Sequence, residues 1–398
     1  MKVSTDKQKI KEILERGVEE IFDKKHLEKE LLSGRQLRIK HGVDPTGSKI
    51  HIGRATQYWK LKALQDLGHQ IVIIIGDFTA RIGDASDKES MRRPLTDQEI
   101  EDNFKSYKDQ IGKVLDMEKV EVRYNSEWLA KISTKELISL MQNFTAQQLI
   151  QRRNFKERWE AGKPIGLHEI CYPIFQGYDS VAIKSDLETG GSDQLFNLGV
   201  GRQLQEIFKQ PAQDIMTLKM VWGLDGRKMS TSWGNVINIT DEPKEMFGKV
   251  MSMKDEHIME YFQLCTNLEL DEIAKIQADL IDQGNFRDAK ALLAQTIVCM
   301  YHGQQAGQDA TSEFDRIFKD KEIPADIPEF EIKEKRVNIL DLLVTIKMAP
   351  SKQEAKRLIT QGGIKIDNLV LTDFKQDIEI KNDMIIQKGK RIFVKIKQ

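Results

Sequence analysis

Two short segments, far apart in the chain, combine residue types that are suited to holding a phosphate. The first is His51-Ile52-Gly53-Arg54, which leads into a predicted helix. A helix N-terminus offers unpaired N–H groups and the positive end of the helix dipole, and a glycine lets an anion approach the backbone closely. The second is Lys228-Met229-Ser230-Thr231-Ser232, a lysine on a loop of small residues. Together the two segments predict nucleotide chemistry on a triphosphate.

Polar residues between these segments are suited to recognising a small polar molecule. Gly76 to Thr79 and Gly83-Asp84 follow an apolar run, where carboxylates could hold an ammonium group or a ribose. Gly190 to Gln194 is a glycine turn that presents a carboxylate and an amide. A third group recurs at i, i+4 and i+7, which would place it on one side of a helix: Tyr172, Gln176 and Asp179. Ordinary turn chemistry or a solvated helix face would also explain these patterns.

The elements that position these residues follow a βαβ pattern. Arg38 to Val43 is predicted as a strand, Ile52 to Leu67 as a helix that ends at Gly68, and Ile71 to Ile75 as a second strand. The second strand is continuously apolar, as strands buried in parallel sheets are. We therefore expect an α/β fold with a Rossmann-like, doubly wound parallel sheet, in which ligands bind beyond the carboxyl ends of the strands.

The rest of the chain predicts further domains. Further strands or strand ends are expected at Val181 to Lys184, Gly190-Gly191 and Ile215 to Val221. The expected domains are a catalytic domain with N-terminal helices (1–235), an α-helical domain (236–318), a linker (319–336) and a small α+β module (337–398). In that module Ser351 caps a basic helix that runs to Gln361.

Composition narrows the class of protein. The chain has a net charge of −1, but residues 337–398 contain 12 Lys and Arg against 7 Asp and Glu. A basic terminal module favours contact with a polyanion, although surface scatter would also explain it.

The three cysteines form no CxxC pair, no apolar run is long enough to span a bilayer, and no signal peptide is evident. We expect a cytoplasmic protein without metal. The sequence lacks the dinucleotide-binding motif GxGxxG, the P-loop motif GxxxxGK[ST], the zinc-protease motif HExxH and the serine-hydrolase motif GxSxG.

Six motifs together resemble the class I bacterial tyrosyl-tRNA synthetases of the sub-group with a C-terminal S4 domain. In chain order they are Gly42 to Thr46, His51 to Gly53, Gly83-Asp84, Tyr172 to Asp179, Gly190 to Gln194 and Lys228 to Ser232. The resemblance covers nearly the whole chain. It implies activation of L-tyrosine with ATP, accompanied by Mg²⁺, and transfer of the tyrosyl group to the 3′ end of tRNA(Tyr). It also implies a homodimer, no tightly held cofactor, an anticodon-binding type of helical domain and an S4-type RNA-binding module.

The resemblance implies a role for each matching position. The catalytic residues would be Thr46, His51, Arg54, Lys228 and Ser232. ATP would be bound by Gly42, Asp44, His51, Gly53, Gly191, Asp193, Gln194, Lys228, Met229 and Ser230. Tyrosine would be bound by Lys40, Thr79, Asp84, Tyr172, Gln176 and Asp179, with Asp179 accepting the phenolic hydroxyl. RNA would be contacted by Lys352, Lys356 and Arg357.

Three positions depart from the pattern of many relatives. Arg54 stands where the first motif usually ends in His, Thr231 stands where the loop often has a second Lys, and Lys40 stands where many relatives have Tyr. Arg227 is a candidate to replace the missing loop charge. The first two departures leave one alternative open, a catalytically silent paralogue that binds RNA. A second alternative is a tryptophanyl-tRNA synthetase, which shares the fold, although Asp179 and the S4-like tail disfavour it.

Overall fold

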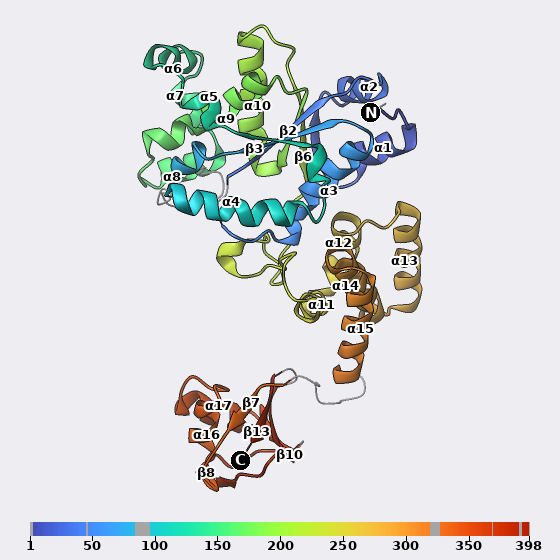
Figure 1. The fold of residues 1–398 in the computed structure, drawn as a ribbon, viewed down its shortest axis with the longest axis vertical. Helices are drawn as coiled ribbons and strands as arrows, with labels where there is room; N and C mark the ends of the chain where they lie inside the picture. The colour runs from blue at the N-terminus through green and yellow to red at the C-terminus, as the bar shows by residue number, and fades with distance from the viewer. Residues whose placement is uncertain are drawn as a thin grey trace. The chain divides into compact units, whose positions relative to one another are not determined.

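The computed structural model describes residues 3–44, 47–83, 96–318, 327–367, 369–389 and 392–397. The chain divides into two compact units, Met1–Ala310 and Thr311–Gln398 (Figure 1). Helix α15 (Gln304–Phe318) spans the boundary between them. Each unit is described by itself.

The first unit is built on a six-stranded sheet with the order β1-β6-β5-β2-β3-β4. The strands β2 to β6 are parallel, and β1 pairs antiparallel with β6 at one edge. The strand bounds are β1 (Val18–Phe22), β2 (Arg38–Val43), β3 (Gln70–Ile75), β4 (Val120–Tyr124), β5 (Leu187–Gly191) and β6 (Asp214–Leu218). Because β3 lies on one side of β2 and β5 on the other, the strand order reverses at β2, which is where such sheets form a crevice.

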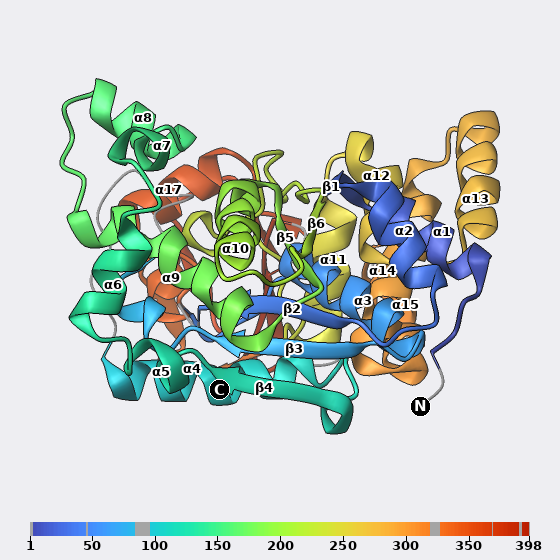
Figure 2. The same ribbon diagram turned by 90° about the horizontal axis from the view of Figure 1, so that it is seen from above.

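Helices cover both faces of this sheet, as a Rossmann-like fold requires. In Figure 1, α9 and α10 lie above the strands and α3 and α4 below them, and Figure 2 shows β2, β3 and β4 running side by side. The helices in this part are α1 (Lys7–Glu15), α2 (Lys24–Leu32), α3 (Ile52–Asp66), α4 (Asp97–Ile111), α5 (Ser126–Leu129), α6 (Thr134–Met141), α7 (Ala146–Ile150), α8 (Arg153–Glu160), α9 (Leu167–Ile183) and α10 (Leu195–Ile207).

The predicted βαβ unit is confirmed. Strand β2 has the predicted bounds, α3 and β3 agree with prediction to within one residue at each end, and β2 pairs parallel with β3. The apolar run of β3 is fully buried, and Gly68 follows α3 with a positive φ of 96°. The hydrophobic pattern was sufficient here because both faces of a central parallel strand are covered.

Two predictions in this unit were wrong. The N-terminal segment was expected to be helical, but β1 lies between α1 and α2. Residues 181–184 were expected to form a strand, but Val181 to Ile183 are the last turn of α9, and Lys184 ends it in the left-handed region with a φ of 52°. A short run of β-branched residues is ambiguous between a buried helix end and a strand.

The residues expected to be helical after 235 form four helices before α15. They are α11 (Pro243–Ser252), α12 (Ile258–Cys265), α13 (Leu270–Gln283) and α14 (Phe286–His302). They pack on the sheet-bearing part: Nε1 of Trp59 on α3 donates to the hydroxyl of Tyr301 at 3.0 Å. Arg16 donates to the carbonyls of Gln263, Thr266 and Leu268. Among the described residues, no helix has the length and apolar character needed to cross a membrane.

The second unit contains a small α+β module. A five-stranded sheet has the order β10-β9-β12-β13-β7, and β8 pairs with β11. Its elements are β7 (Glu329–Glu331), β8 (Arg336–Asn338), α16 (Ile339–Thr345), α17 (Lys352–Thr360), β9 (Ile364–Ile366), β10 (Leu369–Val370), β11 (Asp377–Glu379), β12 (Met384–Lys388) and β13 (Ile392–Lys397). The side chain of Ser351 caps α17 by accepting from the N–H of Glu354, as predicted.

The predicted linker at 319–336 is too long at its C-terminal end. Strand β7 pairs parallel with β13, Phe330 packs on the core of the module, and Ile332 is buried in that core. The alternation of Phe330 and Ile332 with charged residues was the missed signal, since the charged positions dominated the composition. Residues 319–326 lie outside the described part of the chain.

Candidate active site

A cavity of about 590 Å³ opens at the carboxyl ends of β2, β3, β5 and β6. Its walls combine the loop before α3, the glycine turn after β5, one side of α9 and the Lys228 loop. The predicted site residues that line it are Gly42, Asp44, His51, Gly53, Arg54, Thr79, Tyr172, Gln176, Asp179, Gly191, Asp193, Gln194, Lys228, Met229, Ser230 and Ser232. The structure therefore brings the two phosphate-binding candidates into one cavity.

The N-terminus of α3 forms one wall. His51 is its N-cap, and Nδ1 of the imidazole accepts from the N–H of Arg54 at 3.2 Å. Burial, together with the charges of Arg54 and Lys228, lowers the pKa of His51 to about 3, so the imidazole is neutral at physiological pH. Because Nδ1 accepts a hydrogen bond, the ring proton lies on Nε2, and the imidazole can act as a neutral donor.

The Lys228 loop packs directly on this helix start. A Cβ on Gly53 would lie 3.2 Å from Cβ of Val221 and 3.3 Å from Sδ of Met229, so glycine allows this close packing without a shift of the neighbouring side chains. Nζ of Lys228 lies 3.2 Å from Oδ2 of Asp193, across the cavity. The hydroxyls of Ser230 and Ser232 are 2.9 Å apart.

Asn235 holds the loop in its folded form. Its Oδ1 accepts from the N–H of Ser230 at 2.9 Å, and its Nδ2 donates to the carbonyl of Lys228 at 3.1 Å and to Oδ1 of Asp225 at 2.7 Å. Asp225 also accepts from the guanidinium of Arg227. Asn235 is 5% exposed. This buried amide, which the sequence analysis missed, therefore fixes the position of the lysine.

Asp44 lies on the side of the cavity formed by α9. Its Oδ2 accepts from the hydroxyl of Tyr172 at 2.7 Å, and its Oδ1 accepts from the hydroxyl of Thr79 at 2.9 Å. A Cβ on Gly76 would overlap both Asp44 and Thr79, so only glycine permits this arrangement. Asp44 was predicted to bind ATP, whereas its two hydrogen-bond partners were predicted to bind tyrosine.

Asp179, on α9, contributes a buried carboxylate to the wall of the cavity. It is 3% exposed, and its Oδ1 accepts from Nε1 of Trp128 at 2.8 Å. Nδ2 of Asn125 lies 3.4 Å from Oδ2. Burial raises the pKa of Asp179 to about 7, although the charge of Lys40 and the two donors oppose the shift. Asn125 also lines the cavity, and the sequence analysis missed it.

Lys40 does not line the cavity, in contrast to its predicted role in direct tyrosine binding. Its Nζ lies 2.9 Å from Oε1 of Glu188, and both side chains are almost completely buried. The ammonium also donates to the carbonyl of Gln176 at 2.8 Å and to the hydroxyl of Ser180 at 2.9 Å. Lys40 points inward from β2 and supports Glu188 and Gln176, which do line the cavity.

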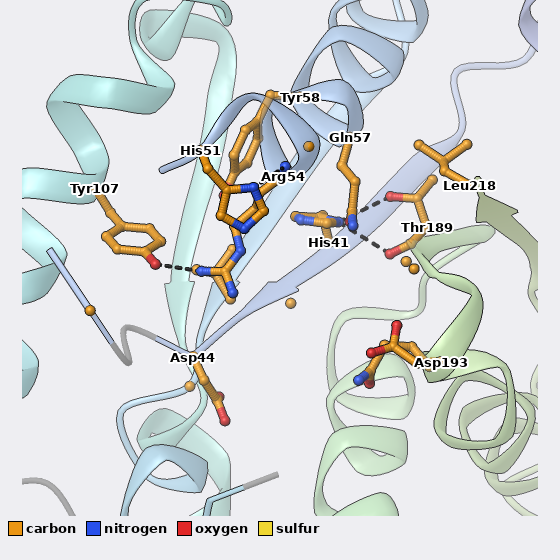
Figure 3. A pocket seen from close by; sticks show the side chains of 18 of the residues that line it. His41, Asp44, His51, Arg54, Gln57, Tyr58, Tyr107, Thr189, Asp193 and Leu218 are labelled. Carbon is orange, nitrogen blue, oxygen red and sulfur yellow. Dashed lines mark hydrogen bonds between the residues drawn. The ribbon is translucent and has the colours of Figure 1, made fainter. Parts of the chain in front are cut away.

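The ribose-clamp candidates lie in a short turn after β5. Ser192 to Gln194 form a 3₁₀ turn, and a Cβ on Gly191 would lie 2.6 Å from Oδ1 of Asp193. His41 lines the same region, with Nδ1 3.1 Å from the carbonyl of Thr189 (Figure 3). Burial lowers the pKa of His41 to about 4. The sequence analysis missed His41 because it lies within a predicted strand.

The remaining predicted site residues lie elsewhere. Thr46 and Asp84 are outside the described residues. Arg227 is paired with Asp225 and does not line the cavity, so it is not placed to replace a loop lysine. In the part of the chain that the structure describes, no group of His, Cys, Asp or Glu is arranged to hold a metal ion.

The predicted RNA-binding residues lie on α17 of the terminal module. Arg357 forms a two-point pair with Glu354 at 2.6 and 2.8 Å, and Lys352 pairs with Asp341. Nζ of Lys356 lies 4.6 Å from the ring centroid of Phe374. Of the three predicted residues, Lys356 has an aromatic rather than an acidic neighbour in these contacts.

The fold and cavity define a nucleotide-binding α/β protein, and comparison with known families identifies its class. Residues 32–319 match the family of class I tRNA synthetases (W and Y). Residues 320–396 match the tyrosine–tRNA ligase SYY-like C-terminal domain. The chain therefore belongs to the class I tRNA synthetase family of the tryptophan and tyrosine enzymes.

Individual relatives agree with this assignment. The chain is 45% identical to the tyrosine–tRNA ligase of Moorella thermoacetica, over 96% of this chain and 94% of that protein. It is 42% identical to the tyrosine–tRNA ligase of Thermotoga maritima, over 96% of both chains.

Solved structures agree on the fold. A C-terminally truncated mitochondrial tyrosyl-tRNA synthetase from Aspergillus nidulans has a TM-score of 0.65 at 19% identity, covering 78% of this chain and 94% of that one. The tyrosyl-tRNA synthetase from Archaeoglobus fulgidus, solved with L-tyrosine, has a TM-score of 0.61 at 19% identity, covering 76% of this chain and 99% of that one.

Proposed function

We propose that this chain is a tyrosine–tRNA ligase, which activates L-tyrosine with ATP and transfers the tyrosyl group to the 3′ end of tRNA(Tyr). The observation that supports this most strongly is the buried carboxylate of Asp179, which lines the same cavity as Lys228 and the start of α3. The carboxylate suits a phenolic hydroxyl, and Lys228 with the start of α3 suits a triphosphate.

In the first step, a carboxylate oxygen of tyrosine attacks the α-phosphorus of ATP, which enters as its Mg²⁺ complex. The bond from the α-phosphorus to the bridging oxygen breaks, and pyrophosphate leaves with the electron pair. The attacking group is already an anion, so no general base is required. The protein contributes positioning and charge stabilisation: Lys228, the N–H groups of α3 and the neutral imidazole of His51 face the phosphates.

The remaining parts of the substrate have matching partners. Asp193 and Gly191 hold the ribose. Tyr172, Gln176 and Thr79 surround the ammonium group together with Asp44, whose carboxylate accepts from the hydroxyls of Tyr172 and Thr79. Thr46 and Asp84 keep their predicted roles in this proposal. In the second step, the terminal ribose hydroxyl of the tRNA attacks the carbonyl carbon, and AMP leaves.

Asp179 provides selectivity for tyrosine over phenylalanine. The phenolic O–H donates to the carboxylate, whereas phenylalanine would leave a desolvated carboxylate without that donor. A cavity that ends in a carboxylate also disfavours tryptophan, whose indole N–H lies at a different point of a larger ring system.

The terminal module and the helical domain are proposed to bind tRNA. The module has more basic than acidic residues, and Lys356 beside Phe374 offers a cation together with an aromatic face.

We propose a cytoplasmic location, where translation uses charged tRNA. We also propose a homodimer, because four large apolar side chains on α6, α8 and α9 are exposed: Ile138, Met141, Trp159 and Leu167.

The test is amino-acid-dependent exchange of labelled pyrophosphate into ATP, followed by charging of tRNA. Exchange that depends on tyrosine, and not on tryptophan or phenylalanine, supports the proposal. Exchange with tryptophan instead would favour a tryptophanyl-tRNA synthetase. No exchange with any amino acid, combined with retained tRNA binding, would favour a silent RNA-binding paralogue.

A further inference from the structure

Helix α4, which the sequence analysis did not connect with the site, supports the phosphate end of the cavity. The hydroxyl of Ser106 donates to the carbonyl of Ser48 at 2.7 Å, and Nε2 of Gln110 donates to the same carbonyl at 2.8 Å. Oε1 of Gln110 accepts from the N–H of Ile50 at 2.7 Å. These contacts fix the segment that leads into His51.

Tyr107, between those two residues on α4, contacts the first turn of α3. It is 1% exposed and lines the cavity with its hydroxyl edge. Nη1 of Arg54 donates to the Tyr107 hydroxyl at 2.5 Å, and the guanidinium carbon lies 5.9 Å from the ring centroid (Figure 3). A buried, rigid phenol therefore determines where the guanidinium of Arg54 lies in the cavity.

Cations at the phosphate end come from two elements. Arg54, whose backbone N–H bonds the His51 imidazole, lines the same cavity as Lys228. Both charges lower the pKa of His51, which is neutral. Within the Lys228 loop, Arg227 is paired with Asp225 outside the cavity, and Thr231 faces the cavity without charge. Lys49 and Lys219 also line the cavity, but they are exposed residues, and neither contributes to the shift at His51.

We propose that Arg54 supplies the second positive charge on the leaving pyrophosphate, with Lys228 supplying the first, and that Tyr107 is a positioning residue that aims Arg54. Pyrophosphate leaves with two electrons on its bridging oxygen, so it requires more than one cation to stabilise the developing charge. A fixed guanidinium can bond two phosphate oxygens with a planar pair of N–H donors, whereas a lysine ammonium acts as a point charge on a flexible stem. This inference rests on the proposed function and specifies how this chain performs it.

The test is tyrosine-dependent pyrophosphate exchange, with KM measured for pyrophosphate and for tyrosine. Arg54→Gln is expected to raise KM for pyrophosphate by about tenfold to a hundredfold, the effect of one charged hydrogen bond, and to leave KM for tyrosine unchanged. Arg54→Lys keeps the charge and should lose less. Arg35, which pairs with Glu30 and Asp186 and does not line the cavity, offers the matched control: Arg35→Gln should leave both constants unchanged.

Two further variants separate a charge effect from a structural one. Thr231→Lys places a cation on the cavity wall and should recover most of the loss in the Arg54→Gln background. Tyr107→Phe removes one hydroxyl and should raise KM for pyrophosphate in the wild type, but have no effect in the Arg54→Gln background. A merely structural role for Tyr107 would lower activity equally in both backgrounds.

The outcomes distinguish the inference from the function on which it rests. One outcome would overturn the inference and leave the function intact. In it, the wild type shows tyrosine-dependent exchange, but the Arg54→Gln/Thr231→Lys variant is as impaired as Arg54→Gln alone. An Arg35→Gln variant as impaired as Arg54→Gln would overturn it too. A wild-type protein with no tyrosine-dependent exchange would reject the proposed function and this inference with it.

Discussion

Nζ of Lys228 lies 3.2 Å from Oδ2 of Asp193, so an ion pair joins the lysine loop to the turn that follows β5. The two residues come from opposite walls of the cavity. A ribose that bonds Asp193 and a pyrophosphate that bonds Lys228 would each replace one half of this pair. In the proposed function, binding of ATP would therefore exchange a protein–protein contact for two protein–ligand contacts on the same two groups.

The first prediction concerns this lysine. Lys228→Met should reduce the rate of tyrosyl-adenylate formation by about 10²- to 10³-fold, because it removes a cation that acts on the leaving group. KM for tyrosine should change little, since Asp179 and α9 are untouched. Lys105→Met, an exposed residue of α4, is the control and should be silent. A Lys228→Met variant that lost tyrosine affinity and kept its rate would contradict the assignment.

The second prediction follows from the raised pKa of Asp179, which burial moves to about 7 from an ordinary value of 3.8. The phenol donates to the ionised carboxylate, so KM for tyrosine should fall as pH rises through about 7 and level off above it. Asp179→Asn should abolish this dependence and reduce discrimination against phenylalanine. A wild-type KM for tyrosine that does not vary between pH 6 and 8 would be inconsistent with this role.

The same shift makes a prediction about stability. A carboxyl whose folded pKa is raised contributes stability that is fully present below its unfolded pKa and is lost as pH rises through the folded value. Asp179→Asn should therefore increase Tm more at pH 8 than at pH 5. Thermal unfolding of the two proteins at both pH values is the measurement, and an equal effect at both would refute the shifted titration.

The buried pair of Lys40 and Glu188 gives a third prediction. Lys40→Met should destabilise the chain by about 3–5 kcal/mol, because it leaves a buried carboxylate without its cation. The double variant with Glu188→Met should recover much of that loss, since a well-packed apolar pair can replace a buried ion pair. Denaturant unfolding compares the variants. A double variant whose loss equals the sum of the losses of Lys40→Met and Glu188→Met would show that the two residues are not energetically coupled.

The fourth prediction concerns the terminal module. A chain that ends after Phe318 should keep tyrosine-dependent exchange and lose charging of tRNA, because the cavity lies wholly in the first unit. Cutting at Val337 instead should give an aggregation-prone protein, since it would leave β7 and Ile332 without their core. Normal charging by the shorter chain would show that the module is not the tRNA contact proposed.

The sequence alone was sufficient to predict the architecture around the first phosphate motif. A buried apolar strand, a capped amphipathic helix and a glycine are local features, and the chain from Arg38 to Ile75 folds as they predict. Most of the residues that the resemblance assigned to the ATP and tyrosine sites line the cavity. Strand β1 and the end of α9 were missed because their short runs do not distinguish helix from strand.

The supporting residues could not be predicted, because they act through contacts between distant parts of the chain. Tyr107 contacts Arg54 across 53 positions, and Trp128 contacts Asp179 across 51. No periodicity indicates such pairs. Lys40 was placed in the site by resemblance, but alternation along β2 turns it toward Glu188 and away from the cavity.

The most direct measurement is a crystal structure of the full chain with a non-hydrolysable tyrosyl-adenylate analogue. We predict that the phenolic oxygen will lie within hydrogen-bond distance of Asp179, the ribose on Asp193, and the phosphate between the start of α3 and Lys228. An analogue bound elsewhere, or bound with its adenosine at Asp179, would contradict the account.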